Sequence, residues 1–233
     1  MSNDLKKKLK FLFYKIPSSY ILTFHHISAK PENKKSGCIL DTDKFIKIID
    51  SYNNYSSINE VVRHPFKRKV AISFDDGLED VYTIAYPYLK SRNIPFTIFI
   101  VADFLDKEGY ITKSQLLEMT QDPLVTVGSH GLTHNVLKSM ELEKQREELL
   151  ESQRALEKIL QKPVVLFAYS HGQFDKTTLK EVRIYKYAMA VNRLPINFIT
   201  NKKKYQIPRL NVENSTFDNV LELLSGMKGT KND

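Results

Sequence analysis

The sequence predicts a single α/β domain built around a parallel sheet, and three observations lead to this fold class. The chain has 233 residues, a length that suits one undivided α/β domain. Strand-like runs rich in β-branched and aromatic residues alternate with helical segments from end to end, and such alternation favours a parallel sheet. Aspartates and histidines follow directly after several of these runs, where barrel folds carry their active sites.

The strand-like runs recur at intervals along the chain. The first, at 20–27, ends in His25-His26, and neighbouring side chains on a strand face opposite sides. At most one of these histidines can therefore serve a site in the core. Further strands are expected, from their β-branched and aromatic content, at 70–74, 95–101, 125–128, 163–169, 187–191 and 205–212.

Helical segments separate most of these strands. A helix that opens at Asp41-Thr42-Asp43 has apolar positions at Phe45, Ile46, Ile48 and Ile49. The other helices are expected at 79–91, 112–119, 141–160, 176–185 and 215–224. Pro87 implies a kink or a break in its helix, and Thr112 and Gln115 have the spacing of a capping box. The segment 57–62 is ambiguous between a strand and a short helix, and the charges of 141–160 are interpreted as a solvated outer face.

Two adjacent carboxylates follow the strand at 70–74. Asp75 and Asp76 can reach one point only if the backbone turns there, and Gly77 permits such a turn. Two carboxylates at a strand end repel each other unless a cation or a proton separates them. One interpretation is a metal or acid–base site. The other is an ordinary Asp-Gly turn in which Asp76 caps the following helix.

Two histidines follow the strand at 125–128. His130 and His134 are spaced i, i+4, which on a helical turn places both imidazoles on one face. Histidine is the commonest metal ligand, and two histidines with one carboxylate suit zinc or another divalent first-row metal. A histidine pair alone is also common in surface turns. Its combination with Asp75-Asp76 favours a metal site.

Ser73-Phe74-Asp75-Asp76-Gly77 and Ser129-His130-Gly131-Leu132-Thr133-His134 resemble the first two motifs of the polysaccharide deacetylases, carbohydrate esterase family 4, also called the NodB homology domain. The resemblance extends more weakly from about Ile21 to about Val212. It implies a distorted (β/α)7 barrel and the metal-dependent removal of an acetyl group from an N-acetylated sugar. The sugar could belong to a polysaccharide, a lipid-linked glycan or a nucleotide-linked precursor.

A subgroup of this family, which includes enzymes acting on poly-N-acetylglucosamine, carries its motifs in circularly shifted order. Phe24-His25 is similar to the aromatic-His pair at the end of its N-terminal strand, which implies that His25 is the general acid. Phe167-Ala168-Tyr169 resembles its third motif, although Ser170-His171 replaces the usual Pro-Tyr. The resemblance implies that Tyr169 and His171 bind the substrate, with the His171 backbone N–H contacting the oxyanion.

The segment 208–212 is similar to the last strand of that subgroup. Arg209 is the candidate for the cation that pairs with Asp75, and the alternative is an ordinary surface arginine. In the implied reaction Asp76, His130 and His134 hold the metal, Asp75 takes a proton from water, and His25 protonates the leaving nitrogen. A bound Zn²⁺ lowers the pKa of water to about 7 and polarises the carbonyl.

Charge and cysteine content limit the partners and the compartment. The net charge of +8 is compatible with an anionic partner, but no nucleic-acid-binding signature accompanies it, and a solvated lysine-rich surface is the preferred explanation. Cys38 is the only cysteine, so no internal disulfide forms and secretion is unsupported.

The predicted domain boundaries are a basic N-terminal segment at 1–17, a catalytic domain at 18–227 and a flexible tail at 228–233. Residues 5–15 are too short for a signal-peptide core or a membrane span. The preferred reading is a frayed helix packed on the domain. The alternative is a basic, aromatic segment that contacts an anionic membrane surface. A cytoplasmic protein is expected, at the inner membrane face if that contact forms.

Two alternatives to the deacetylase stay open at this stage. The first is a catalytically inactive glycan-binding domain on the same fold, which the departures at Phe24 and Ser170-His171 keep in view. The second is a non-haem iron enzyme, because two histidines and one carboxylate also describe that metal triad. The alternation of strands and helices argues against the iron enzyme, whose chemistry usually occurs on antiparallel barrels.

Overall fold

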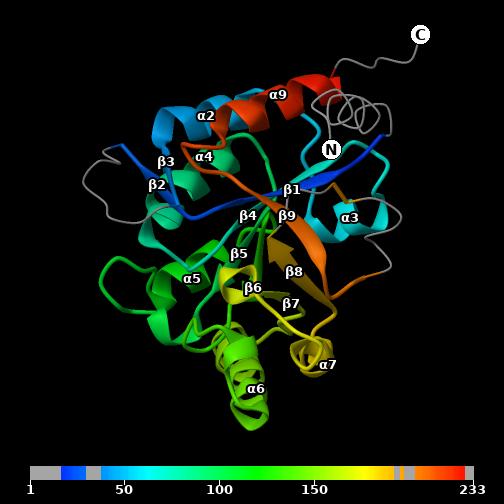
Figure 1. Cartoon of the computed structure of the whole chain (residues 1–233). Helices are drawn as coiled ribbons and strands as arrows, with labels where there is room; N and C mark the ends of the chain where they lie inside the picture. The colour runs from blue at the N-terminus through cyan, green and yellow to red at the C-terminus, as the bar shows by residue number, and fades with distance from the viewer. Residues whose placement is uncertain (1–16, 30–37, 192–194, 197–202, 229–233) are drawn as a thin grey trace.

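Seven parallel strands close into a barrel in which the first strand lies beside the last (Figure 1). The computed structural model describes residues 17–29, 38–191, 195–196 and 203–228. The pairs Leu22–Leu210 and Thr23–Asn211 join the first and last strands, and the single pair Ser129–Phe167 joins the fourth barrel strand to the fifth. The barrel strands, in order, are β1 (Tyr20–Phe24), β4 (Val70–Phe74), β5 (Phe96–Ile100), β6 (Val125–Ser129), β7 (Leu166–Ala168), β8 (Tyr187–Val191) and β9 (Ile207–Asn211). The predicted (β/α)7 barrel is confirmed.

Helices surround the barrel, with α2 and α9 side by side on one flank (Figure 1). The helices are α2 (Thr42–Asp50), α3 (Ile58–Arg63), α4 (Tyr86–Ser91), α5 (Lys113–Met119), α6 (Leu142–Leu160), α7 (Thr178–Glu181) and α9 (Phe217–Lys228). Two short strands, β2 (His26–Ser28) and β3 (Ile39–Asp41), form a separate parallel pair next to the barrel. The strand expected at 20–27 is therefore divided at His25, where the chain leaves the barrel wall.

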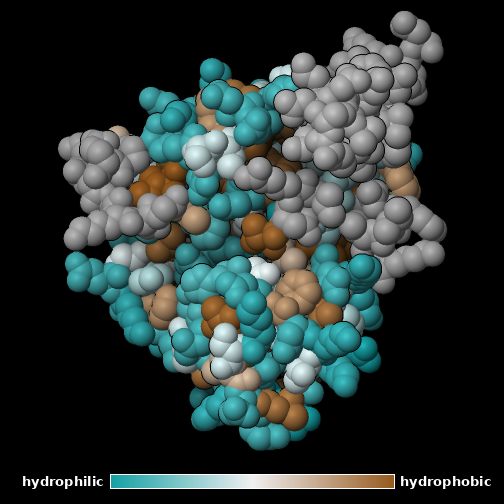
Figure 2. Space-filling model, in the orientation of Figure 1, coloured by the Kyte–Doolittle hydropathy of each residue, from teal (hydrophilic) through white to brown (hydrophobic). Residues whose placement is uncertain are grey.

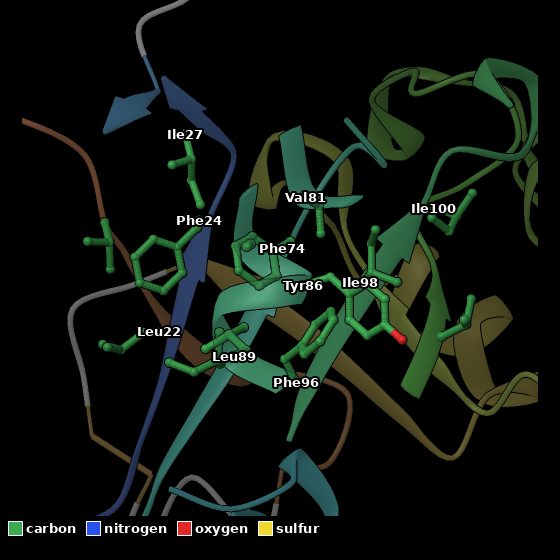
Figure 3. Packing of buried hydrophobic residues seen from close by; sticks show 14 of the residues in the cluster. Leu22, Phe24, Ile27, Phe74, Val81, Tyr86, Leu89, Phe96, Ile98 and Ile100 are labelled. Carbon is green, nitrogen blue, oxygen red and sulfur yellow. The ribbon is translucent and has the colours of Figure 1, made fainter. Parts of the chain in front are cut away.

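The alternation of side chains along each strand separates two hydrophobic layers. The outward-facing residues pack under the helices, and Figure 3 shows Phe24 and Phe74 together in this layer, with ring centroids 5.5 Å apart. The inward-facing residues fill the barrel interior, where Ile21 and Ala71 meet Ile207. Helix α3 contributes Ile58, Val61 and Val62 to this inner cluster.

A polar layer lies above the inner hydrophobic cluster. Thr23, Ser73 and Arg209 come two residues after Ile21, Ala71 and Ile207, so they face inward one level closer to the C-terminal rim. Arg209 Nη1 donates to Thr23 Oγ1 at 3.0 Å and approaches Ser73 Oγ at 3.4 Å. The strand period therefore places the next inward residues, His25 directly after β1 and Asp75 directly after β4, at the mouth of the barrel.

Local chemistry explains several element boundaries. The ambiguous segment 57–62 is helical, because the Ser57 side chain caps α3 by accepting from the Glu60 N–H. The helix expected at 79–91 breaks into a π-helical turn, η2 (Val81–Ala85), followed by α4 with Pro87 in its first turn. The capping box of Thr112 and Gln115 is present.

Two helix boundaries differ from the prediction. The helix expected at 176–185 is shorter, and α7 ends at Glu181 before the 3₁₀ turn η6 (Val182–Ile184). Tyr185 is buried and its hydroxyl donates to the Leu149 carbonyl, which draws the chain away from a helical path. The last helix, α9, extends to Lys228 rather than ending at 224, with Met227 packed in the core.

The described surface seen in Figure 2 is mostly hydrophilic, with hydrophobic residues in separate small patches. Within the described ranges, no helix combines the length and the apolar character needed to cross a membrane. The predicted membrane contact of residues 5–15 concerns residues outside the described ones, as does most of the tail predicted at 228–233. These two expectations, the domain boundaries that depend on them and the cytoplasmic location stay predictions.

Candidate active site

A reversal of the chain directs the two adjacent aspartates to different places. The Asp75 N–H donates to the Phe24 carbonyl at 3.0 Å, continuing the β1–β4 pairing, and its side chain enters the barrel. Asp76 then takes a φ of +70° and Gly77 a φ of +75°, so the predicted turn already begins at Asp76. A Cβ atom at Gly77 would lie 3.1 Å from Ile100 Cδ1, which favours glycine at this position. Asp76 lies away from the start of the following helix, and the N-cap interpretation is wrong.

Asp75 forms a two-pronged ion pair with Arg209 inside the barrel. Arg209 Nη1 lies 2.6 Å from Asp75 Oδ1 and Nη2 lies 2.7 Å from Oδ2, with side chains 0% and 2% exposed. The alternative of a surface arginine is therefore wrong. Burial is the largest influence on the Asp75 pKa and acts to raise it, but the Arg209 charge and hydrogen bonds and the nearby His130 hold that pKa below its ordinary value. The guanidinium also stacks on Phe99, 5.0 Å from the ring centroid.

His130 and His134 converge on Asp76 from an irregular turn. Their Nε2 atoms lie 3.4 and 3.2 Å from Asp76 Oδ1, and their ring centroids are 5.0 Å apart. The expected helical turn is absent from 130–136, because Gly131 and His134 have φ values of +87° and +68°. His130 Nδ1 lies 2.8 Å from the Ala168 carbonyl oxygen, to which it can only donate, and this hydrogen bond fixes the ring with Nε2 directed at Asp76.

This trio has the character of a metal centre. The three candidate ligand atoms all lie within 4.8 Å of one another. Asp76 Oδ1 is buried and has no hydrogen-bond partner among the described residues, as expected for an atom whose partner is a cation. Burial acts to raise the Asp76 pKa, but the imidazoles of His130 and His134 bring it far below its ordinary value, so the carboxylate is ionised. Two imidazoles and a carboxylate fit a divalent first-row metal.

The two histidines after β1 face opposite sides, as predicted. His25 is 17% exposed, and its Nε2 lies 3.9 Å from Asp75 Oδ2. Burial lowers the pKa of His25, although Asp75 and Asp76 act to raise it. His26 turns away, and its Nδ1 lies 3.0 Å from Asp80 Oδ2, which also accepts from the Ile27 N–H at 3.2 Å. Asp80, which the sequence did not single out, therefore fixes the backbone next to His25.

The structure places the two candidate substrate-binding residues of the third motif in different surroundings. Tyr169 is 0% exposed, and its hydroxyl donates to the Tyr205 carbonyl, so its side chain is a packing residue without a surface for substrate. His171 is exposed, with its ring centroid 4.8 Å from that of His134. Its φ of +55° places it in a tight turn held by the Gly172 and Gln173 N–H groups, so the turn does not use the His171 amide.

Further residues that support the site were not predicted. Helix α6 was interpreted as exposing its charges, but Gln145, Glu148 and Ser152 are buried on the face that also carries Leu149 and Leu156. Their spacing of three and four residues is the same helical period as the apolar stripe. The helical spacing of these polar residues could therefore have indicated their burial. It does so only if the buried face of a helix is assumed to carry polar as well as apolar residues.

A closed parallel barrel with one aspartate and two histidines gathered near the C-terminal ends of its strands defines a (β/α)7 protein with a candidate metal site. A sequence profile of the polysaccharide deacetylase family matches residues 63–190, more than half of the chain. The protein belongs to this family.

Curated relatives match about two thirds of the chain. YxkH of Bacillus subtilis (strain 168), whose name places it among the polysaccharide deacetylases, is 27% identical over 150 residues, which are 64% of this chain and 53% of YxkH. A poly-beta-1,6-N-acetyl-D-glucosamine N-deacetylase of Staphylococcus aureus (strain MSSA476) is 29% identical over 175 residues, which are 69% of this chain and 60% of that protein. The chain therefore spans between half and two thirds of the length of these relatives.

Solved structures share the fold over nearly the whole chain. The Streptococcus pyogenes deacetylase PplD in complex with acetate has a TM-score of 0.78 at 24% identity, over 89% of this chain and 98% of that one. IcaB from Ammonifex degensii has a TM-score of 0.74 at 20% identity, over 90% and 97% of the two chains. At these identities the likeness establishes the barrel fold.

Proposed function

We propose that this protein is a metal-dependent hydrolase that removes the acetyl group from an N-acetylated sugar. The observation that carries the proposal is the different surroundings of Asp75 and Asp76. The adjacent carboxylates have different partners, Arg209 for one and two imidazoles for the other. Hydrolysis of an amide needs both a base that stays ionised and a centre of positive charge, and this pair supports the two roles side by side.

Asp76, His130 and His134 are the residues that would hold the metal, with zinc or another divalent first-row ion as the cofactor. The buried Asp76 Oδ1 without a hydrogen-bond partner among the described residues, and the His130 ring that its bond to the Ala168 carbonyl holds with Nε2 toward Asp76, both fit this assignment. When bound, such an ion activates water and polarises the acetyl carbonyl.

Asp75 would act as the general base. Its oxygen atoms are held by Arg209, which keeps the pKa of the carboxyl group below its ordinary value and fixes the direction of its lone pairs. Water attacks the acetyl carbon as Asp75 accepts its proton, and the carbonyl π electrons move onto oxygen. Groups of this kind typically contribute ~100- to 10,000-fold to a rate.

His25 would act as the general acid that protonates the departing nitrogen as the C–N bond breaks. Burial lowers its pKa, so near pH 7 the imidazole is mostly neutral and must gain a proton before it donates one. The proton accepted by Asp75 has a short route to it, because Asp75 Oδ2 lies 3.9 Å from His25 Nε2. The oxyanion re-forms the carbonyl as the C–N electron pair leaves with the nitrogen. The proton moved from water to this nitrogen balances the overall hydrolysis to a free amine and acetic acid, which ionises to acetate.

His171 would provide the contacts to the substrate. Its backbone N–H is available to the oxyanion, because the tight turn is held by neighbouring amides, and its exposed imidazole lies beside His134. Phe104, 6.1 Å from His134 between ring centroids, is a candidate for contact with a sugar ring. The Staphylococcus aureus relative is named for poly-β-1,6-N-acetylglucosamine, which supports an N-acetylglucosamine-containing glycan as the substrate class.

Acetate release from an N-acetylglucosamine oligomer tests the function, with zinc-loaded wild type beside Asp75→Asn and His25→Ala. We expect release that needs metal and falls by at least ~100-fold in either variant. Metal binding without release from oligomeric, lipid-linked or nucleotide-linked substrates would instead favour the inactive glycan-binding domain. Turnover that needs iron and oxygen would favour the non-haem iron alternative.

A further inference from the structure

The backbone turn that carries His130 and His134 is hydrogen-bonded to a buried carboxylate, that of Glu148. Glu148 Oε2 accepts from the Leu132 N–H at 2.8 Å and from the Thr133 N–H at 3.1 Å, and the Thr133 hydroxyl donates to Oε1. Both amides lie between the two histidines. Glu148 belongs to an outer helix, α6, yet it is only 4% exposed. Its carboxylate therefore points into the protein and toward the turn.

A second set of contacts from the same helix supports this turn. The Gly131 N–H donates to Ser129 Oγ at 3.1 Å, and Ser129 Oγ lies 2.9 Å from Ser152 Oγ. Ser152 and Glu148 are four residues apart and so lie on one face of α6. Gly131, with a φ of +87°, brings the backbone so close that a Cβ atom there would lie 3.3 Å from Glu148 Oε2.

The two histidine ligands are held by different means. His130 lies directly after β6, and its ring is fixed by the hydrogen bond to Ala168. His134 comes after the irregular stretch 131–133, and its position depends on the path of that stretch. Hydrogen bonds from N–H groups to a buried carboxylate are roughly twice as strong as neutral ones. Glu148 thus restrains the part of the turn that determines where the His134 imidazole lies.

We propose that Glu148 is a positioning residue of the metal centre, which orders the turn so that His134 Nε2 faces Asp76 before an ion binds. This inference rests on the proposed metal-dependent function. Loss of the carboxylate leaves two partly buried N–H groups without their acceptor and allows 131–133 to rearrange. Mutation of a residue that orients a metal ligand without touching the metal typically weakens metal affinity by about 10- to 100-fold.

The test measures the Zn²⁺ dissociation constant by competition with a chromogenic chelator for wild type, Glu148→Ala and Glu148→Gln. We expect about 10- to 100-fold weaker binding for Glu148→Ala. Glu148→Gln should lose much less, because its carbonyl can accept both N–H groups while its amide donates to Thr133 Oγ1. The Co²⁺ absorption spectrum should change in Glu148→Ala, since the position of one imidazole ligand changes.

Two control variants on α6 separate positioning from general loss of stability. Glu151→Ala removes an exposed carboxylate that pairs with Arg154, and Leu156→Ala weakens the packing of the helix away from the turn. Both should bind Zn²⁺ within about 2-fold of wild type, since neither contacts the turn. If Leu156→Ala weakens binding as much as Glu148→Ala does, the positioning role is wrong.

The outcomes also separate this inference from the proposed function. Tight binding to wild type and equally tight binding to Glu148→Ala would overturn the positioning role and leave the metal site intact. Failure of wild type to bind any first-row ion would overturn the metal-dependent function itself. If Glu148→Ala does not fold, Glu148→Asp is the deciding variant. Its side chain is one methylene shorter, so the carboxylate keeps its charge but lies farther from the turn, and Zn²⁺ binding should weaken.

Discussion

Replacement of Arg209 by methionine should reveal how much stability depends on the ion pair inside the barrel. In Arg209→Met the Asp75 carboxylate remains 2% exposed in the native geometry but loses a partner that made contacts of 2.6 and 2.7 Å. Breaking a buried pair by removing one partner costs about 3–5 kcal/mol. In a domain of this size each 1 kcal/mol lowers the Tm by about 2–4 °C, so we expect a fall of about 6–20 °C.

A double-mutant cycle with Asp75→Asn isolates the charge interaction. Asp75→Asn alone leaves the Arg209 guanidinium buried without its counter-charge, so it should also destabilise the protein by several kcal/mol. The double variant carries neither charge, and replacement of a whole buried pair by neutral residues is often tolerated. We therefore expect the double variant to be more stable than the sum of the two single changes implies, and it should still release no acetate.

The assay is urea and thermal unfolding of metal-free protein at pH 7, followed by circular dichroism. The free energies of unfolding of wild type, both single variants and the double variant give the coupling energy directly. Additivity within about 0.5 kcal/mol would refute the reasoning, because it would mean that the two side chains contribute independently. A fall of less than about 2 °C in Arg209→Met would refute it as well.

Three further predictions concern the metal, the two adjacent histidines and the cysteine. Chelation should lower the Tm of wild type, and Zn²⁺ at about 100 times its dissociation constant should restore about 2.7 kcal/mol, whereas thermal scans of His130→Ala should show no such response. His25→Ala should lower kcat for acetate release by about 100- to 10,000-fold. His26→Ala should retain most of the activity and lose about 1 kcal/mol of stability, because it removes the hydrogen bond to Asp80. Equal losses of kcat in the two variants would contradict the opposite orientations of these histidines. Burial raises the pKa of the Cys38 thiol, so a disulfide reagent should modify native protein more slowly than unfolded protein at pH 8. The rate of modification should increase with pH. Equal rates for native and unfolded protein would show that this thiol is accessible.

The barrel and the positions of Asp75 and His130 could be predicted from local sequence because each of these residues directly follows a strand. Asp75 and His130 come directly after runs whose strand character is visible in composition, and parallel strands bring such ends to one rim. The contact of Arg209 with Asp75 joins positions 134 residues apart. The family resemblance, rather than the local pattern around Arg209, provided that expectation.

The residues that sequence reasoning missed are those whose surroundings are decided by tertiary packing. Glu148 stands in a charged helix, and local composition does not distinguish it from Glu151, which is exposed. Tyr169 follows a strand like the other site residues, but its ring packs against Phe174 and Phe167 in the core. His134 reaches Asp76 through a left-handed backbone conformation that no spacing rule predicts.

The adjacency of β1 and β9 also determines when the site can exist during synthesis. The ribosome adds about 5–20 residues per second, so Asp75 emerges roughly 7–27 seconds before the arginine 134 positions later. Until β9 is made the sheet cannot close, and β1 and β8 lack the strand that finally lies between them. A chain halted before β9 would expose two strand edges and leave the Asp75 carboxylate without the Arg209 guanidinium. Translation of the last barrel strand therefore completes both the closed sheet and the buried ion pair.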